Sequence, residues 1–190
     1  NNNYLRESFD GCYRLVEIYN CSQLNIQAQK TDNGYISRYA LNVYTPTSGQ
    51  SLLEKTNEGF VFCGNSLVAY IGQETNLVLP ETYNEKSYKI NGYAFYGNNN
   101  LVSVRMPDTI TAIGSYAFGN CINLEQINIS SNVTKIQVSA FINCKKLTQI
   151  TIPDSVTYID YEAFRGCTSL ISAKFETTGW KRSGDSTAGS

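Results

Sequence analysis

Six cysteines give this 190-residue chain its most reactive side chains. Cys121, Cys144 and Cys167 follow one another at intervals of 23 residues, which does not match the short C-x2-C clamps of zinc sites. If the interval is a structural repeat, equivalent side chains lie roughly parallel and about 5 Å apart, because that is the spacing of neighbouring strands. A disulfide needs converging Cβ atoms about 3.8 Å apart. We therefore predict a column of small, buried thiols rather than disulfides.

The other three cysteines fall outside this column. Cys12 is predicted to take the same position in an earlier repeat. Cys63 stands beside a Gly-Asn turn signal and is predicted to be the most exposed of the six. Cys21 has no position in the pattern, and the sequence leaves open whether Cys21 or Cys63 is reactive or paired.

The sequence contains no catalytic constellation of an ordinary kind. Histidine is absent from the chain, which removes the commonest general base and the commonest metal ligand. A serine triad or a Cys-His pair is thereby excluded in its usual form. The neighbouring carboxylates Asp160 and Glu162 fall on a turn, where solvated surface side chains are the better interpretation. We predict that the chain is not an enzyme and has no catalytic, cofactor-binding or metal-ligating residue.

Charge and hydropathy exclude further classes of partner. The formal net charge is -1, and acidic and basic residues are interspersed. Such a chain lacks the basic surface that steers proteins to nucleic acids or anionic lipids. No stretch reaches the roughly 18 consecutive apolar residues of a membrane span. We expect neither nucleic-acid binding nor membrane insertion.

The cysteine column belongs to a longer repeat, marked by an Ala-Phe pair that returns every 23 residues. The pairs are Ala94-Phe95, Ala117-Phe118, Ala140-Phe141 and Ala163-Phe164. A fixed period in the twenties, with leucine and isoleucine at fixed places, is typical of leucine-rich-repeat solenoids. The predicted fold class is α/β, a right-handed leucine-rich-repeat solenoid of 23-residue repeats.

Each repeat is predicted to contain two extended runs and one turn. In the third repeat the first run ends at Pro153, with Ile150 and Ile152 pointing inward at period two. The second, shorter run covers residues 156–159. The Ala-Phe-x-x-Cys segment is predicted to form a short helical or 3-10 turn. The fold is therefore expected to be strand-rich, and each layer becomes stable only when its neighbours stack on it.

Residues 20-93 interrupt the period and are predicted to form an irregular, double-length repeat with a β-hairpin insertion. The hairpin is placed at residues 59–62 and 66–71, joined by a turn. Four extra residues are placed within 83–87, because the spacing from Pro80 to Phe95 exceeds that from Pro107 to Phe118.

We predict one leucine-rich-repeat domain over residues 1-180. It comprises an early repeat at 8–19, the irregular repeat at 20-93, regular repeats at 94-175 and an end cap at 176-180. Trp180 is predicted to cover the last coil, since an open solenoid end needs apolar cover. Residues 181-190 are predicted to be a mobile tail.

The outward positions of the first extended runs form the candidate partner-binding surface, which we call the polar stripe. Its residues are Ser103, Arg105, Gln126, Asn128, Gln149, Thr151, Ser172 and Lys174. The stripe has a cation near each end and lies on the face that such solenoids use for binding. The competing interpretation is a merely solvated sheet face. Tyrosines near the turns, at Tyr93, Tyr116, Tyr158 and Tyr161, are either packing spacers or contact residues.

The repeat AF-x-x-C-x-x-L-x-x-I-x-I-P-x-x-V-x-x-I resembles the BspA-like, treponemal-type leucine-rich repeats of many bacterial surface proteins. Residues 12–92 also resemble the irregular module of gut-bacterial members, through the turn Asp32-Asn33-Gly34 and the Gly-Phe-Val-Phe hairpin. The sequence departs from the family pattern at Asn98, usually cysteine, and at Ser130-Ser131, usually Pro-Asp. The resemblance implies a secreted or cell-surface protein of a gut bacterium that adheres to host or bacterial proteins. It brings no catalytic residues with it.

The expected function is therefore a non-catalytic, adhesin-type protein-binding module. The alternatives are a carbohydrate- or cell-wall-binding module, which would need an exposed aromatic platform, and a structural spacer in a larger surface protein. The expected partner is a host or bacterial surface protein, with a glycan as the alternative, and no cofactor is expected. A monomer is favoured, and the oligomeric state is left open.

Overall fold

The computed structural model describes Cys12, Leu15 and residues 17–19, 28–29, 42–44 and 53–176. The chain divides into two compact units, Asn1–Glu54 and Lys55–Ser190. The predictions for Cys21, for the Trp180 cap and for the tail at 181–190 lie outside the described residues. The single domain over 1–180 stays a prediction.

The described part of the first unit contains one pair of strands, the Cys12–Leu15 turn, turn residues 28–29 and the start of β3. Strands β1 (Glu17–Tyr19) and β2 (Asn42–Tyr44) pair in parallel. The amide of Leu15 donates to the carbonyl of Cys12 at 3.0 Å, as the amide of Leu124 does to Cys121 at 3.1 Å. Cys12 and Leu15 therefore make the same turn hydrogen bond as Cys121 and Leu124. The Cys12 side chain is exposed, however, so its predicted place in the buried column is wrong.

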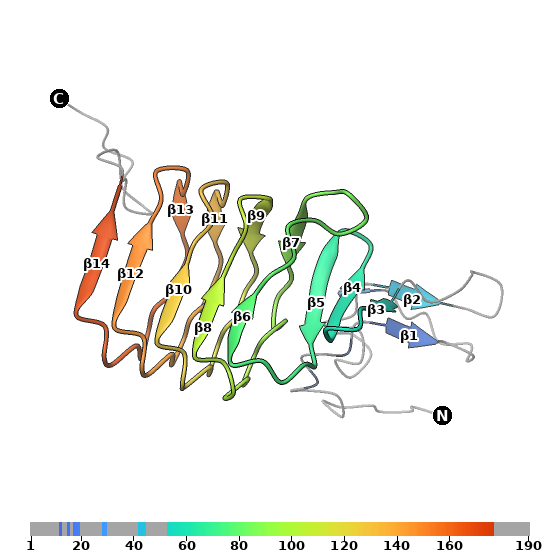
Figure 1. Cartoon of the computed structure of the whole chain (residues 1–190), viewed down its shortest axis with the longest axis horizontal. Helices are drawn as coiled ribbons and strands as arrows, with labels where there is room; N and C mark the ends of the chain where they lie inside the picture. The colour runs from blue at the N-terminus through green and yellow to red at the C-terminus, as the bar shows by residue number, and fades with distance from the viewer. Residues whose placement is uncertain are drawn as a thin grey trace, which may run out of the picture. The chain divides into compact units, whose positions relative to one another are not determined.

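Five short parallel strands form one face of the second unit. They are β6 (Asn76–Val78), β8 (Ser103–Arg105), β10 (Gln126–Asn128), β12 (Gln149–Ile152) and β14 (Ser172–Phe175). Figure 1 shows them side by side. Gln126 lies opposite Ser103 and Gln149 lies opposite Ser172, so these partners are 23 positions apart in the chain. Each of these strands therefore comes from a successive coil.

Figure 1 shows β9, β11 and β13 behind β8, β10 and β12, and these three strands belong to a seven-stranded sheet. Its strands are β3 (Leu53–Lys55), β4 (Phe60–Cys63), β5 (Ser66–Tyr70), β7 (Tyr88–Ile90), β9 (Ile110–Ile113), β11 (Lys135–Ile136) and β13 (Tyr158–Ile159). Their order in the sheet is β13-β11-β9-β7-β5-β4-β3, and the boundary between the two units falls within β3. Strands β4 and β5 are antiparallel, which confirms the predicted hairpin.

The Ala-Phe segments are hydrogen-bonded turns, in which the amides of Ala117, Gly119 and Cys121 donate to carbonyls three residues earlier, as in the expected 3-10 turn. Residues 53–176 contain no helix, so these bonds do not continue into a regular helical turn. Left-handed residues bracket each segment, for example Tyr116 at φ 56° and Asn120 at φ 57°. Left-handed backbone cannot continue a right-handed helix. The amide of Phe118 instead donates to the carbonyl of Ala140, in the next coil, at 2.8 Å. The fold is a strand-rich solenoid.

Phenylalanine and cysteine form two columns in the core. The rings of Phe95, Phe118, Phe141 and Phe164 stack in sequence, with centroid separations of 4.7, 5.4 and 5.2 Å. Cys121 and Cys144 are buried thiols and Cys167 is a half-buried one, which confirms the predicted column. The Sγ atom of Cys144 donates to the carbonyl of Phe118 at 3.2 Å. A hydrogen bond with Cys167 and, after it, burial raise the pKa of the Cys144 thiol.

Cys63 is buried, and its predicted exposure is wrong. It is the last residue of β4 and lies opposite Ser66, so only Gly64 and Asn65 form the turn. The hairpin register shifts between Val61 and Phe62, which interrupts the alternation of inward and outward side chains. Phe62 and Cys63 are consequently both buried.

The predicted insertion within 83–87 is a tight turn. The backbones of Tyr83 and Lys86 exchange two hydrogen bonds of 3.0 and 3.1 Å. Asn84 and Glu85 lie between them at φ 49° and 61°. The Tyr83 ring stacks on Phe62 with centroids 3.8 Å apart, which ties this turn to the hairpin.

Candidate binding site on the parallel strands

Alternation along the parallel strands separates core residues from surface residues. In β10 the middle residue, Ile127, is buried, while Gln126 and Asn128 are exposed; β12 shows the same pattern around Ile150. A period of two follows from the pleat of an extended chain. The polar side chains of these strands therefore share one outward face.

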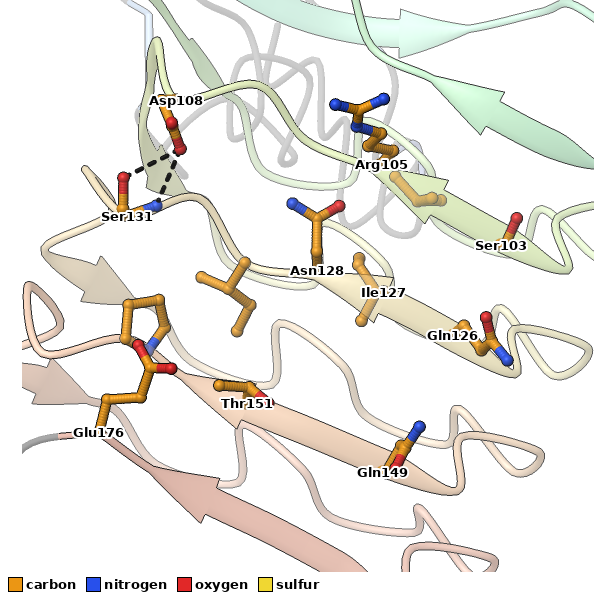
Figure 2. A pocket seen from close by; sticks show the side chains of 13 residues that line it. Ser103, Arg105, Asp108, Gln126, Ile127, Asn128, Ser131, Gln149, Thr151 and Glu176 are labelled. Atoms are coloured by element: carbon orange, nitrogen blue, oxygen red, sulfur yellow. Dashed lines mark hydrogen bonds between the residues drawn. The ribbon is translucent and has the colours of Figure 1, made fainter.

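This outward face contains a hollow of about 660 Å³, which we call the polar hollow (Figure 2). Its lining residues are Ser103, Val104, Arg105, Asp108, Gln126, Ile127, Asn128, Ile129, Ser131, Gln149, Thr151, Pro153 and Glu176. The volume falls in the range of known ligand pockets, about 300–1,000 Å³. The lining includes six of the eight residues of the polar stripe. It does not include Ser172 and Lys174, which lie on the exposed strand β14.

The polar hollow lies where the ladder of strand pairs is interrupted. Among the described residues, β10 pairs with β8 and β12 pairs with β14, but β10 and β12 do not pair with each other. The hollow is lined from both sides of this break. Outward side chains of both β10 and β12 line the hollow.

Asn128 is occupied by the fold itself. Its Oδ1 atom accepts a hydrogen bond from the amide of Met106 at 2.8 Å. Its Nδ2 atom donates to the carbonyl of Met106 at 2.9 Å. This two-point contact fixes the end of β8, so the amide of Asn128 is committed to the protein rather than offered to a ligand.

The acidic residues that line the polar hollow also have partners within the protein. Asp108 accepts hydrogen bonds from the hydroxyl of Ser131 at 2.9 Å and from its amide at 3.4 Å. Glu176 lies 3.7 Å from the ammonium of Lys174. Figure 2 shows Asp108, Ser131 and Glu176 at one end of the hollow. Their charges are partly compensated before any ligand arrives.

Four other lining side chains keep their polar ends available. Arg105, Gln126, Gln149 and Thr151 make no side-chain hydrogen bond or ion pair with any part of the chain that the structure describes. Arg105 is therefore the only charged lining residue without a partner there. Gln126 and Gln149 lie on neighbouring strands at the end of the hollow opposite Asp108 (Figure 2). The site thus offers one guanidinium, two amides and a hydroxyl.

Sequence reasoning missed several residues of this face. Asn76 and Val78 on β6 lie opposite Ser103 and Arg105, and Val78 is 62% exposed. The signal was the spacing of Leu77 and Leu79, which are two residues apart as Ile150 and Ile152 are, so that Asn76 and Val78 fall on the outward side. Asp108, Ser131, Pro153 and Glu176 were missed because they follow the strands. The signal for Asp108 and Ser131 was their shared repeat position.

The turn tyrosines divide into two groups. Tyr93 and Tyr116 stack with centroids 5.0 Å apart and planes 6° apart, and Tyr96 contacts both rings edge-on. These three rings are half-buried, which fits packing spacers. Tyr158 and Tyr161 are exposed, Tyr161 by 71%.

The carboxylates near these tyrosines have structural partners. Asp160 accepts a hydrogen bond from the amide of Tyr161 at 2.7 Å. Glu162 pairs with Arg165 at 2.6 Å. Both carboxylates therefore stabilise the turn that contains them.

The fold and its outward polar face define a leucine-rich-repeat solenoid. The family pattern described as BspA type Leucine rich repeat region matches residues 69–184, in six copies. This span is more than half of the chain, and the chain belongs to that family. No curated protein matches the chain. Within the described ranges, no helix is long and apolar enough to cross a membrane.

Three solved structures illustrate the similarity. A leucine-rich repeat protein from Bacteroides capillosus ATCC 29799 is 28% identical with a TM-score of 0.54, and the match covers 66% of this chain and 93% of that chain. The leucine-rich repeat protein TpLRR of T. pallidum is 22% identical with a TM-score of 0.50, covering 65% and 79%. The pneumococcal vaccine antigen PcpA is 18% identical with a TM-score of 0.60, covering 84% and 38%. The last two similarities concern the fold alone.

Proposed function

We propose that this chain is a non-catalytic, adhesin-type protein-binding module that is secreted or displayed at the cell surface. It binds a host or bacterial surface protein with the outward face of strands β8, β10 and β12. The observation that carries the proposal is the polar hollow, in which Arg105, Gln126, Gln149 and Thr151 have no partner among the described residues. Solenoids of stacked repeats commonly bind partners on such an extended face.

The composition of the polar hollow favours protein over sugar as the ligand. None of its 13 lining residues is aromatic, whereas sugar rings are commonly held against aromatic faces. Arginine is enriched in protein–protein interfaces, and amide and hydroxyl side chains can adapt to varied hydrogen-bond partners.

A carbohydrate- or cell-wall-binding module is the second candidate, and one observation favours it. Tyr93, Tyr96 and Tyr116 form a half-buried aromatic cluster on the turns. A sugar would bind there rather than in the polar hollow. The two candidates therefore place the ligand on different residues and can be separated by substitution.

The test is a binding panel with a variant that fills the polar hollow. Purified chain is passed over immobilised extracellular-matrix proteins, bacterial surface proteins and a glycan array. Thr151→Trp places a bulky ring in the hollow, and Thr111→Trp makes the same change at an exposed position on β9 of the other sheet. We expect binding to at least one protein that Thr151→Trp abolishes and Thr111→Trp leaves intact.

Signal on glycans alone would overturn the choice of a protein ligand. Silence on every surface would leave a structural spacer as the function of the chain. Protein binding that both variants retain would exclude the polar hollow as the site.

A further inference from the structure

We propose that the ligand of the polar hollow is an extended polypeptide segment with an acidic side chain that binds Arg105. The inference rests on the proposed function and gives it a chemistry. Three observations carry it: the distribution of unpaired charge, the kind of hydrogen-bonding groups that stay available, and the form of the hollow.

The unpaired charge in the polar hollow is positive. Three lining residues are charged, and two of them are compensated: Asp108 by two hydrogen bonds from Ser131, and Glu176 by Lys174. Arg105 is exposed and forms no ion pair within residues 53–176. A guanidinium presents several donors in a planar fork that matches a carboxylate in two-point contact. The hollow is therefore complementary to an Asp or Glu side chain or to a chain-terminal carboxylate.

The available amides suit a peptide backbone. Gln126 and Gln149 occupy equivalent positions on neighbouring coils and lie at the same end of the hollow (Figure 2). Each carries one carbonyl acceptor and an NH2 donor, the same pair of functions that a peptide group presents. Thr151 adds a hydroxyl that can donate or accept. These groups can satisfy the main chain of a segment whatever its side chains are.

The form of the hollow suits an extended chain. From Gln126 to Ser131 the lining residues follow a run of five steps, which spans at most about 17 Å in extended conformation. A ligand that lies along this run has room for about five extended residues. An acidic glycan would offer the same carboxylate, but no lining aromatic ring is present to hold its sugar faces. A polypeptide is thus the better match.

The test is a selection of random twelve-residue peptides displayed on phage against the purified chain, with counter-selection on Arg105→Gln. We expect the enriched peptides to share an Asp or Glu at one position. Each peptide is then synthesised with that acid and with its amide counterpart, and the dissociation constant is measured by fluorescence anisotropy. Loss of a hydrogen bond to a charged group weakens binding by about tenfold to a hundredfold, and this is the loss expected for Arg105→Gln with the acidic peptide.

Matched variants separate charge from fold and from general electrostatics. Arg165→Gln removes the same charge from an exposed side chain outside the hollow and should leave binding unchanged. Arg105→Lys should retain part of the affinity. In a double-mutant cycle, the amide form of the peptide should lose little further affinity on Arg105→Gln, because the two changes remove one interaction. Thermal melts of every variant check that the fold is intact.

The outcomes distinguish this inference from the proposed function. Enrichment of peptides without a required acid, or with basic residues, overturns the acidic segment and leaves protein binding standing. Peptides whose affinity is equal for wild type and Arg105→Gln overturn the assignment to Arg105. A selection that yields no peptide, together with binding to acidic oligosaccharides on a glycan array, overturns both proposals.

Discussion

Phe141 provides a quantitative test of the stacked core. Its side chain is fully buried, and its ring lies between Phe118 and Phe164 at 5.4 and 5.2 Å, with both pairs of planes only 3° from parallel. Phe141→Ala removes the ring and leaves a cavity that neighbouring coils cannot easily fill. Such substitutions cost about 3–5 kcal/mol. We expect the upper half of that range, because each aromatic pair adds roughly 0.5–1.5 kcal/mol beyond its buried area.

The assay is urea unfolding followed by circular dichroism, with Phe175→Ala as the matched control. Phe175 is 48% exposed on β14, so the same truncation there should cost about 1 kcal/mol. Total stabilities of domains are about 5–15 kcal/mol, and a loss near 4 kcal/mol is large on that scale. Equal destabilisation by the two substitutions, or a loss below 1 kcal/mol for Phe141→Ala, would refute the assignment of the phenylalanine column to the core.

Three further predictions concern single side chains. Asn128→Ala should lower the free energy of unfolding by about 1–3 kcal/mol, because it leaves the amide and carbonyl of Met106, at the end of β8, unpaired. Gln126→Ala, the control, should change this free energy little, and urea unfolding measures both variants. Burial, followed by the nearby charge of Glu81, raises the pKa of Tyr88. The stability that Tyr88 contributes should therefore be complete below about pH 10, the pKa of unfolded tyrosine, and decline above it; unfolding of Tyr88→Phe across pH 9–11 should show a shallower decline. Because the pKa of Cys144 is raised, iodoacetamide at pH 8 should modify this thiol much more slowly in the folded chain than in urea, as read by mass spectrometry of its peptide. Equal rates in both conditions would contradict its burial.

Features that repeat could be predicted from the sequence, because every coil has the same residue types at the same positions. The Ala-Phe pair fixed the phenylalanine column, and the inward pair of β12, Ile150 and Ile152, fixed which side chains of that strand point outward. The geometry of strand stacking then excluded disulfides in the cysteine column. The polar stripe followed from the same alternation, and six of its eight residues line the polar hollow.

Features that depend on one local contact could not be predicted in this way. Asn128 has the sequence position of a ligand-binding residue, but its amide pairs with the backbone of Met106. Cys63 follows a register shift that periodicity does not reveal. The Ala-Phe turns have the spacing of a short helix, but only alternate amides bond within the turn, and the others, such as that of Phe118, donate to the next coil. Hydrogen bonding to the next coil is a tertiary interaction, and it overrides the local preference for a helical turn.

The break between β10 and β12 is also invisible in the sequence. Both strands have the same alternating pattern as their neighbours, and nothing in that pattern marks a break between them. The coil between them carries Ser130 and Ser131 where the family usually has Pro-Asp. The polar hollow is lined by residues on both sides of this break.

Amide hydrogen exchange of the chain with its bound partner tests the central claim most directly. The partner is the protein that gives the strongest signal on the binding panel, and exchange is read by mass spectrometry with and without it. We predict slower exchange in peptides that contain β8, β10 and β12, and little change in the turns around Tyr93 and Tyr116. Protection confined to those turns, with unchanged exchange across the three strands, would contradict the assignment of binding to the polar hollow.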